Sequence, residues 1–297
     1  MKKLLNTLYV TSENSYLRLE GETVVICDGE QKMGQVPLHN LDGIVSFGYK
    51  GVSPALMGAC MERKVSVCFL SPQGKFLARV TGEECGNILL RKQQFASVKN
   101  DKISLEIARN CILGKVFNSR WILERAIRDH SMQIDVEKVR RVSQQMKHSL
   151  TIIQSAESLD QLRGYEGAAA NVYFSVFDEL ILQQKKEFSF QGRNRRPPMD
   201  NVNAMLSFVY TLLTTQITAA LETVGLDPYV GYLHTTRPGR ASLALDLIEE
   251  LRAPLADRFV LSLINKKIVN KNNFTKKENG AVLMDADARK NLLIEWQ

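Results

Sequence analysis

The pattern of apolar residues changes near residue 90, and this change constrains the fold more than any other feature of the chain. Before it, short runs rich in β-branched and aromatic residues, such as TVVICDG and GKFLARV, are bounded by Gly, Asn, Asp or Pro. Such punctuation predicts short strands joined by turns. One stretch, SPALMGACMERK, interrupts them, and it predicts a helix capped by Ser53 with Pro54 in its first turn.

After residue 90, apolar residues recur three and four positions apart, which is typical of amphipathic helices. Three later helices are predicted at residues 158–186, 200–223 and 241–252. A small hairpin is expected around Asn279-Gly280, and a last helix begins near Asp285. We therefore expect an α+β fold with a β-rich domain at 1–90 and a larger, mainly helical domain at 91–297. Because the chain stops within that last helix, we expect the helical domain to be truncated at its C-terminus.

The composition is that of a globular protein with a basic surface. The formal net charge of +7 favours polyanionic partners such as nucleic acid. Five cysteines without CxxC spacing predict neither a disulfide framework nor a zinc knuckle. The chain has no Walker loop and no GxSxG elbow, which argues against P-loop nucleotide hydrolases and α/β-hydrolases. Residues 201–221 carry no formal charge but are too polar for lipid, so we expect a buried helix, no membrane segment and a cytoplasmic protein.

The segment GYLHTTRPGRASLALDLIEE places His234 upstream of a helix that carries Asp246 and Glu249. Acids three apart on a helix share a face. One imidazole and two carboxylates, with coordination positions left open, suit Mn²⁺ or Mg²⁺ better than a closed structural zinc. Alternatively, His234 is a core histidine beside an ordinary acidic helix, with Glu250 on the solvent face and Arg252 nearby to support it.

A further acid, Glu166, lies in the apolar stretch RGYEGAAAN between Gly164 and Gly167. Small neighbours allow a ligand or another backbone to come close to its carboxylate. Alternatively, the small residues serve helix packing, and Glu166 pairs with an arginine such as Arg163.

Several basic and polar residues are candidates for phosphate or DNA contacts. Arginine holds phosphates bidentately, although solvated loop arginines are the commoner case. The candidates are Arg237 and Arg240, the basic run Lys185, Lys186, Arg193, Arg195 and Arg196, and the stripe Asn203, Ser207, Tyr210 and Thr214. That stripe either lines the site or hydrogen-bonds neighbouring helices.

Three blocks occur in a fixed order: LRGYEGAAANVYF, then RPPMDNVNAMLSFVYTLL, then GYLHTTRPGRASLALDLIEELR. In that order they resemble CRISPR-associated protein one, the integrase family of spacer acquisition, in the form closest to type I-C systems. The resemblance covers essentially the whole chain. It implies an N-terminal β domain that drives homodimerisation and a C-terminal helical domain with a divalent-metal site.

The same resemblance implies roles for individual residues. By position in the motifs, Glu166, His234 and Glu249 match the metal ligands of the family, and Asp246 matches a neighbouring conserved acid. Some members carry aspartate where this chain has Glu249, so either of the two acids could be the direct ligand. Asn203 and Tyr210 fall in the block that lines the site in relatives and are candidate DNA contacts.

The reaction implied by the resemblance belongs to antiviral defence. The 3′-hydroxyl of a short duplex DNA attacks a phosphodiester at the edge of a CRISPR repeat, and the same site acts as an endonuclease. Two dimers, bridged by a small partner protein, carry out the insertion of the spacer. Two alternatives stay open from the residues alone: a repair nuclease for branched DNA, and a non-catalytic DNA-binding scaffold whose acids are structural.

Overall fold

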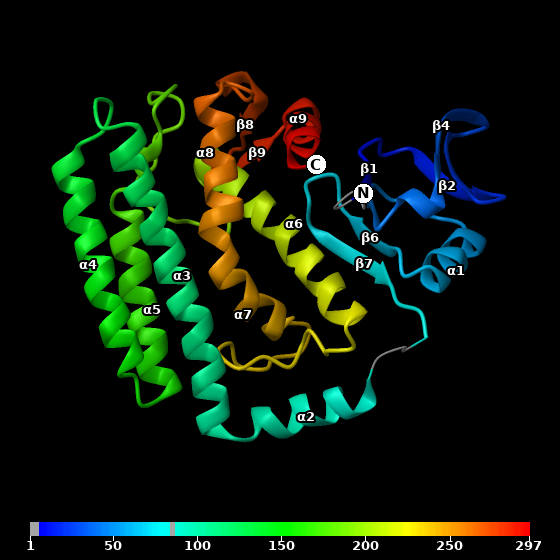
Figure 1. Cartoon of the computed structure of the whole chain (residues 1–297). Helices are drawn as coiled ribbons and strands as arrows, with labels where there is room; N and C mark the ends of the chain where they lie inside the picture. Colours follow the sequence, from blue (N-terminus) through cyan, green and yellow to red (C-terminus); the bar gives the residue numbers. More distant parts are fainter. Residues whose placement is uncertain (1–5, 84–86) are drawn as a thin grey trace. The chain divides into compact units, whose positions relative to one another are not determined.

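Strands and helices segregate along the chain as the apolar pattern predicts (Figure 1). The computed structural model describes residues 6–83 and 87–297. It divides into a first unit, Met1–Cys85 with Met284–Gln297, and a second unit, Gly86–Leu283. The described residues of the first unit form seven strands and those of the second unit are mainly helical, so the expected α+β class is confirmed.

The first unit contains a four-stranded sheet in the order β1-β5-β6-β7 and a three-stranded sheet in the order β2-β3-β4. In the first sheet β1, β5 and β6 are parallel and β7 is antiparallel, whereas the second sheet is antiparallel throughout. The strands are β1 (Thr7–Val10), β2 (Ser15–Glu20), β3 (Thr23–Asp28), β4 (Gln31–Pro37), β5 (Gly43–Phe47), β6 (Ser66–Leu70) and β7 (Phe76–Val80).

The core of this unit is built from side chains of both sheets and of α1 (Pro54–Glu62), including the fully buried Leu17, Ile44 and Leu56. Helix α1 begins as predicted, because the Ser53 side chain accepts a hydrogen bond from the Leu56 N–H and Pro54 occupies the first turn.

Strand β4 was not predicted from the sequence. Its residues, QKMGQVP, are all exposed or half-buried and include Gly34, so the strand lacks the apolar alternation that reveals a buried strand. Strand β4 forms because it pairs with β3, and a local sequence pattern does not reveal such pairing.

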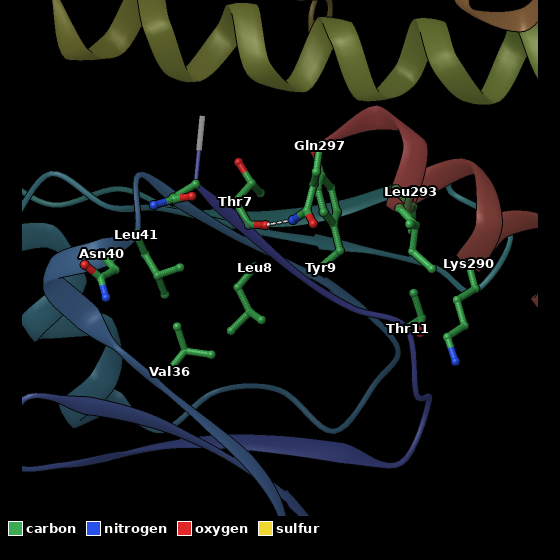
Figure 2. A pocket seen from close by; sticks show the side chains of 12 residues that line it. Thr7, Leu8, Tyr9, Thr11, Val36, Asn40, Leu41, Lys290, Leu293 and Gln297 are labelled. Atoms are coloured by element: carbon green, nitrogen blue, oxygen red, sulfur yellow. Dashed lines mark hydrogen bonds between the residues drawn. The ribbon is translucent and has the colours of Figure 1, made fainter. Parts of the chain in front are cut away.

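Helix α9 (Ala286–Trp296) also belongs to the first unit and starts where the sequence predicts a helix, with the Asp285 side chain accepting from the Ala288 N–H at 2.7 Å. Figure 2 shows the side-chain amide of Gln297 donating to the backbone carbonyl of Thr7 on the edge strand β1. A cavity of about 440 Å³ lies here, and Lys290 is the one charged residue among the described residues that line it.

The second unit is a group of helices with one hairpin. The α-helices are α2 (Ile88–Val98), α3 (Asp101–Asp129), α4 (Val136–Gln154), α5 (Leu159–Phe174), α6 (Asn201–Thr223), α7 (Ser242–Leu251) and α8 (Arg258–Asn265). A π-helical turn, η3 (Arg252–Asp257), joins α7 to α8, and such turns are frequent at functional sites. The predicted hairpin is confirmed as β8 (Phe274–Lys276) and β9 (Val282–Met284), with Gly280 in the left-handed region at φ 80°.

Helix α6 is the uncharged helix that the sequence predicts, and the Asp200 side chain caps it by accepting from the Asn203 N–H at 2.7 Å. Among the described helices it alone is long and apolar enough to cross a membrane. Half of that apolar window is buried within the protein, as in a core helix.

The predicted helix over 158–186 is too long, because α5 ends at Phe174. Beyond it the chain enters a short 3₁₀ turn, η2 (Phe177–Leu180), in which Phe177 packs on Phe190 with ring centroids 4.8 Å apart. The Asp178 carboxylate accepts a hydrogen bond from the Phe190 N–H at 2.7 Å. This aromatic cluster turns the chain away from the helix axis although the local sequence remains apolar.

Candidate functional site

Four segments of the second unit bring the predicted acids and histidine together. Glu166 lies on α5, His234 on the loop before α7, and Asp246 and Glu249 on α7 itself. The fourth segment is α3, which contributes Lys115.

Asp246 holds the His234 loop against α7. Its carboxylate is 1% exposed; Oδ2 accepts from the backbone N–H of Tyr232 at 2.6 Å and of Leu233 at 3.0 Å. Oδ1 accepts from the backbone N–H of His234 at 2.9 Å and lies 2.7 Å from its Nδ1. Each oxygen therefore has two hydrogen-bonding partners, so neither has a lone pair left for a further ligand.

This close approach depends on Gly231. A Cβ at that position would lie 2.6 Å from the backbone carbonyl carbon of Ser242 and 2.8 Å from Oδ2 of Asp246. No side chain fits there without moving the loop off the helix, so the glycine is required for the site to close.

The contact with Asp246 selects one tautomer of His234. An ionised carboxylate only accepts, so the proton lies on Nδ1 and the lone pair lies on Nε2. The His234 side chain is 22% exposed, which leaves Nε2 within reach of a ligand. A histidine oriented by a carboxylate in this way is the usual arrangement of a metal-binding imidazole.

Glu249 is buried between two cations. Its side chain is 4% exposed, with Oε1 3.0 Å from the Arg252 guanidinium and Oε2 2.7 Å from Nζ of Lys115. Burial alone would raise the pKa of Glu249, but Arg252 and Lys115 together bring this pKa below its usual value. Within the described residues, the ammonium group of Lys115 is the one partner of the buried Oε2, so this oxygen keeps a lone pair for a further ligand.

Glu166 faces the same ammonium group, because its Oε1 accepts a hydrogen bond from Nζ of Lys115. The alternative pairing with Arg163 is wrong: that guanidinium binds Asp160 at 2.6 Å and the carbonyl of Leu233 at 2.8 Å. The Glu166 side chain is 27% exposed and lies beside open space. An added Cβ at Gly164 or Gly167 would meet nothing within 4 Å, so these glycines do not serve helix packing.

A buried polar network continues behind Glu249. The hydroxyl of Tyr210 donates to Asp257 at 2.5 Å, and the guanidinium carbons of Arg252 and Arg193 lie 5.0 and 5.2 Å from the centroid of its ring. Burial raises the pKa of Asp257 to about 6, although the bond from Tyr210 and the charge of Arg252 oppose that shift.

The candidate DNA-contacting residues fall into two groups. Asn203 is fully buried; its amide oxygen accepts from Arg193 and from the Asn194 N–H, while its NH₂ donates to Gly192 and Asp200. Arg193 and Asn203 therefore hold the connector before α6 in place. The exposed candidates are Lys185, Lys186, Arg195, Arg196 and Arg237, and Arg240 is half-buried.

No ready-formed group of three metal-binding side chains exists among the residues that the structure describes. The donor atoms nevertheless fit a divalent cation: a lone pair on Nε2 of His234, the buried Oε2 of Glu249, and the partly exposed carboxylate of Glu166. Lys115 holds the two carboxylates together in the present arrangement.

Two residues of the site were missed or misassigned from the sequence. Arg252 pairs with Glu249 rather than supporting Glu250. Lys115 was not singled out, although it falls four residues after Cys111 and four before Ser119, both of which are buried on α3. A lysine within a buried stripe was the signal that could have identified it.

Comparison with known proteins adds an independent result. Residues 8–297 match the family "CRISPR associated protein Cas1". The chain is 47% identical over 297 residues to the CRISPR-associated endonuclease Cas1 1 of Chlorobaculum tepidum, covering 100% of this chain and 87% of that protein.

Two solved structures share the fold. One is a casposase bound to its integration product, with a TM-score of 0.82 and 25% identity over 98% of this chain and 82% of that chain. The other is a Cas6-RT-Cas1–Cas2 complex, with a TM-score of 0.82 and 21% identity over 98% of this chain and 32% of that chain.

Proposed function

Because the chain belongs to the Cas1 family, the endonucleases and integrases of CRISPR spacer acquisition, we propose that Glu166, His234 and Glu249 form its divalent-metal site. Membership of an endonuclease family does not fit the alternative of a non-catalytic scaffold. A repair nuclease for branched DNA would use the same residues and would differ only in its substrate.

One observation carries this assignment: every acceptor position of Asp246 is already used within the protein. Asp246 is thus a positioning residue that fixes the His234 imidazole. Glu249, three residues later, has an Oε2 whose one partner among the described residues is the ammonium group of Lys115, and it is the acid that binds the metal directly once that group gives way. The donor set of one nitrogen and two carboxylates favours Mn²⁺ or Mg²⁺.

The division of labour in strand transfer follows from these positions. When bound, the cation polarises the target phosphodiester and stabilises the leaving oxygen. The nucleophile is a 3′-hydroxyl of the DNA, so the protein needs no nucleophilic side chain. Arg237 and Arg240, on the loop that follows His234, hold the phosphates beside the site, and Arg195 and Arg196 extend this basic track.

The wider assembly is also part of the proposal. The first unit forms the homodimer, and a small partner, Cas2 in relatives, bridges two dimers. We further propose the type I-C form of the family, on the resemblance of the three sequence blocks, and the cytoplasm as the place where the protein works.

A strand-transfer assay tests the proposed site. Wild type and His234→Ala are incubated with labelled branched DNA, with and without Mn²⁺. We expect Mn²⁺-dependent joining and cleavage by the wild type and a loss of both of at least about a hundredfold in the variant, with the melting profile and DNA binding retained. Unchanged activity in His234→Ala would refute the site assignment.

A further inference from the structure

We infer that Lys115 is a built-in counter-ion whose ammonium group occupies the cation position of the site, so that its ion pairs and the bound metal exclude each other. This inference rests on the proposed metal site. It goes beyond that site because it assigns a function to a residue that is not one of the proposed ligands.

The contacts of the ammonium group carry the inference. Nζ of Lys115 donates to Oε1 of Glu166 and lies 2.7 Å from Oε2 of Glu249. These are two of the proposed ligands, and they lie 51 residues and more from Lys115 along the chain. One ammonium group thus bridges two carboxylates from different helices, which is what a divalent cation at this site would also have to do.

The fold holds Lys115 in this place. At Gly114 the helices α3 and α7 come so close that an added Cβ would lie 3.0 Å from Cβ of Glu250. One turn later, the side-chain amide of Asn118 donates to the Glu250 carbonyl at 2.8 Å. Lys115 falls between these two residues along α3, and its side chain is only 11% exposed, so solvent has little access to its charge.

Both carboxylate oxygens of Glu249 already face a cation. Its Oε1 is bound by Arg252 at 3.0 Å, and Oε2 is the atom that Lys115 contacts. Mg²⁺ binds carboxylate oxygens at about 2.0–2.1 Å. A cation that close to Oε2 and to Glu166 would enter the space of the ammonium group, and the two positive charges would repel each other.

A small cavity beside Lys115 can receive its ammonium group when a metal binds. A cavity of about 20 Å³, with room for roughly one water molecule, adjoins Lys115 and is also lined by Tyr210 and Asp257. The four-carbon stem of lysine is flexible enough to release the carboxylates without movement of α3.

Mn²⁺ affinity of the full chain tests the inference, with isothermal titration calorimetry as the readout. Lys115→Met keeps the length of the stem and removes the charge, so we expect Mn²⁺ to bind about tenfold more tightly or better. Lys115→Arg keeps the charge and provides a second test should Lys115→Met fail to fold. The Mn²⁺ affinity of Lys115→Arg should stay at or below that of the wild type. Lys138→Met, which removes an ion pair with Glu179 elsewhere in the unit, is the matched control and should leave the affinity unchanged.

The melting temperature gives a second readout. Without metal, Lys115→Met should melt below the wild type because two buried carboxylates lose their partner, and Mn²⁺ should raise its melting temperature by more than that of the wild type. Equal or weaker Mn²⁺ binding by Lys115→Met overturns the inference.

His234→Ala separates this outcome from a failure of the proposed function. If wild type binds Mn²⁺ and His234→Ala does not, the metal site stands even when Lys115 has no influence on it. If neither the wild type nor Lys115→Met binds Mn²⁺, the metal site and the inference are both refuted. The same holds if His234→Ala binds Mn²⁺ as tightly as the wild type.

Discussion

At the scale of single residues, the buried carboxyl of Asp257 predicts a pH dependence of stability. It faces Tyr173 from α5, Tyr210 from α6, and the guanidinium groups of Arg252 and Arg193. Burial raises its pKa from 3.8 to about 6 in the folded protein. The folded state therefore holds the proton more tightly than the unfolded chain, so this contribution to stability is complete below pH 3.8 and is lost as the pH rises through 6.

We expect the free energy of unfolding, compared with that of Asp257→Asn, to fall by about 2 to 3 kcal/mol between pH 4 and pH 7. Urea denaturation of both proteins across this range measures the difference, in which the titration of the groups they share cancels. The substitution can change the stability of Asp257→Asn by the same amount at every pH. It cannot give the variant the pH dependence that comes from the Asp257 carboxyl. Parallel curves for the two proteins would show that Asp257 does not titrate in this range.

The sequence predicts which residue types meet at the site better than it predicts what each one does. Asp246 and Glu249 are both acids on one helix face, three residues apart. The different roles that we propose for them depend on which of the two the Gly231 loop contacts, and this is a tertiary contact that no local pattern contains. Lys115 is separated from Glu166 by 51 residues, so only the folded chain brings the two together.

At the scale of elements, the contact between the 231–234 loop and α7 predicts how a methyl group added at residue 231 changes stability. Gly231→Ala would place Cβ 2.6 Å from the backbone carbonyl carbon of Ser242, so the loop must leave α7 and its hydrogen bonds to Asp246 must break. We expect a loss of about 3 kcal/mol in unfolding free energy, measured by urea denaturation, together with weaker Mn²⁺ binding.

Gly167→Ala is the matched control for that change. It lies inside α5 with no atom within 4 Å of the added Cβ, so helix propensity should stabilise it by up to about 1 kcal/mol. Similar stabilities for the two variants would mean that the loop tolerates a side chain at residue 231.

Most elements could be predicted because their signals are local. Helices α1, α6 and α9 start, and the β8–β9 hairpin turns, where the local sequence predicts. The two failures have a tertiary cause: β4 depends on pairing with β3, and the end of α5 depends on an aromatic cluster that includes Phe190. Apolar periodicity identifies a buried face but does not say where packing interrupts the helix.

At the scale of the whole molecule, the sequence predicts where strand-rich chain gives way to helical chain. It does not predict that Met284–Gln297 groups with the first unit, because that association joins the two ends of the chain. The net charge is likewise a property of the whole chain, and it indicates a polyanionic partner without naming the residues that contact it.

Replacing the exposed Arg237 tests whether the positive charge of the chain contacts DNA beside the site. This arginine lies three residues after His234 on a turn in which the Arg240 N–H donates to the Arg237 carbonyl at 3.1 Å. We expect Arg237→Ala to weaken duplex DNA binding and to lower the dependence of log affinity on log salt by about 0.9, since one phosphate contact is lost. Fluorescence anisotropy at several salt concentrations measures this slope, and Mn²⁺ affinity should stay unchanged because the arginine is not a ligand.

Arg128→Ala serves as the control for this charge removal. Arg128 is 70% exposed and pairs with Asp129 at 2.8 Å at the end of α3. Both variants lower the net charge by one, so a general effect of charge would change their salt slopes equally. A smaller slope for Arg237→Ala alone requires a phosphate held at the loop beside His234, and equal slopes would remove Arg237 from the DNA-binding surface.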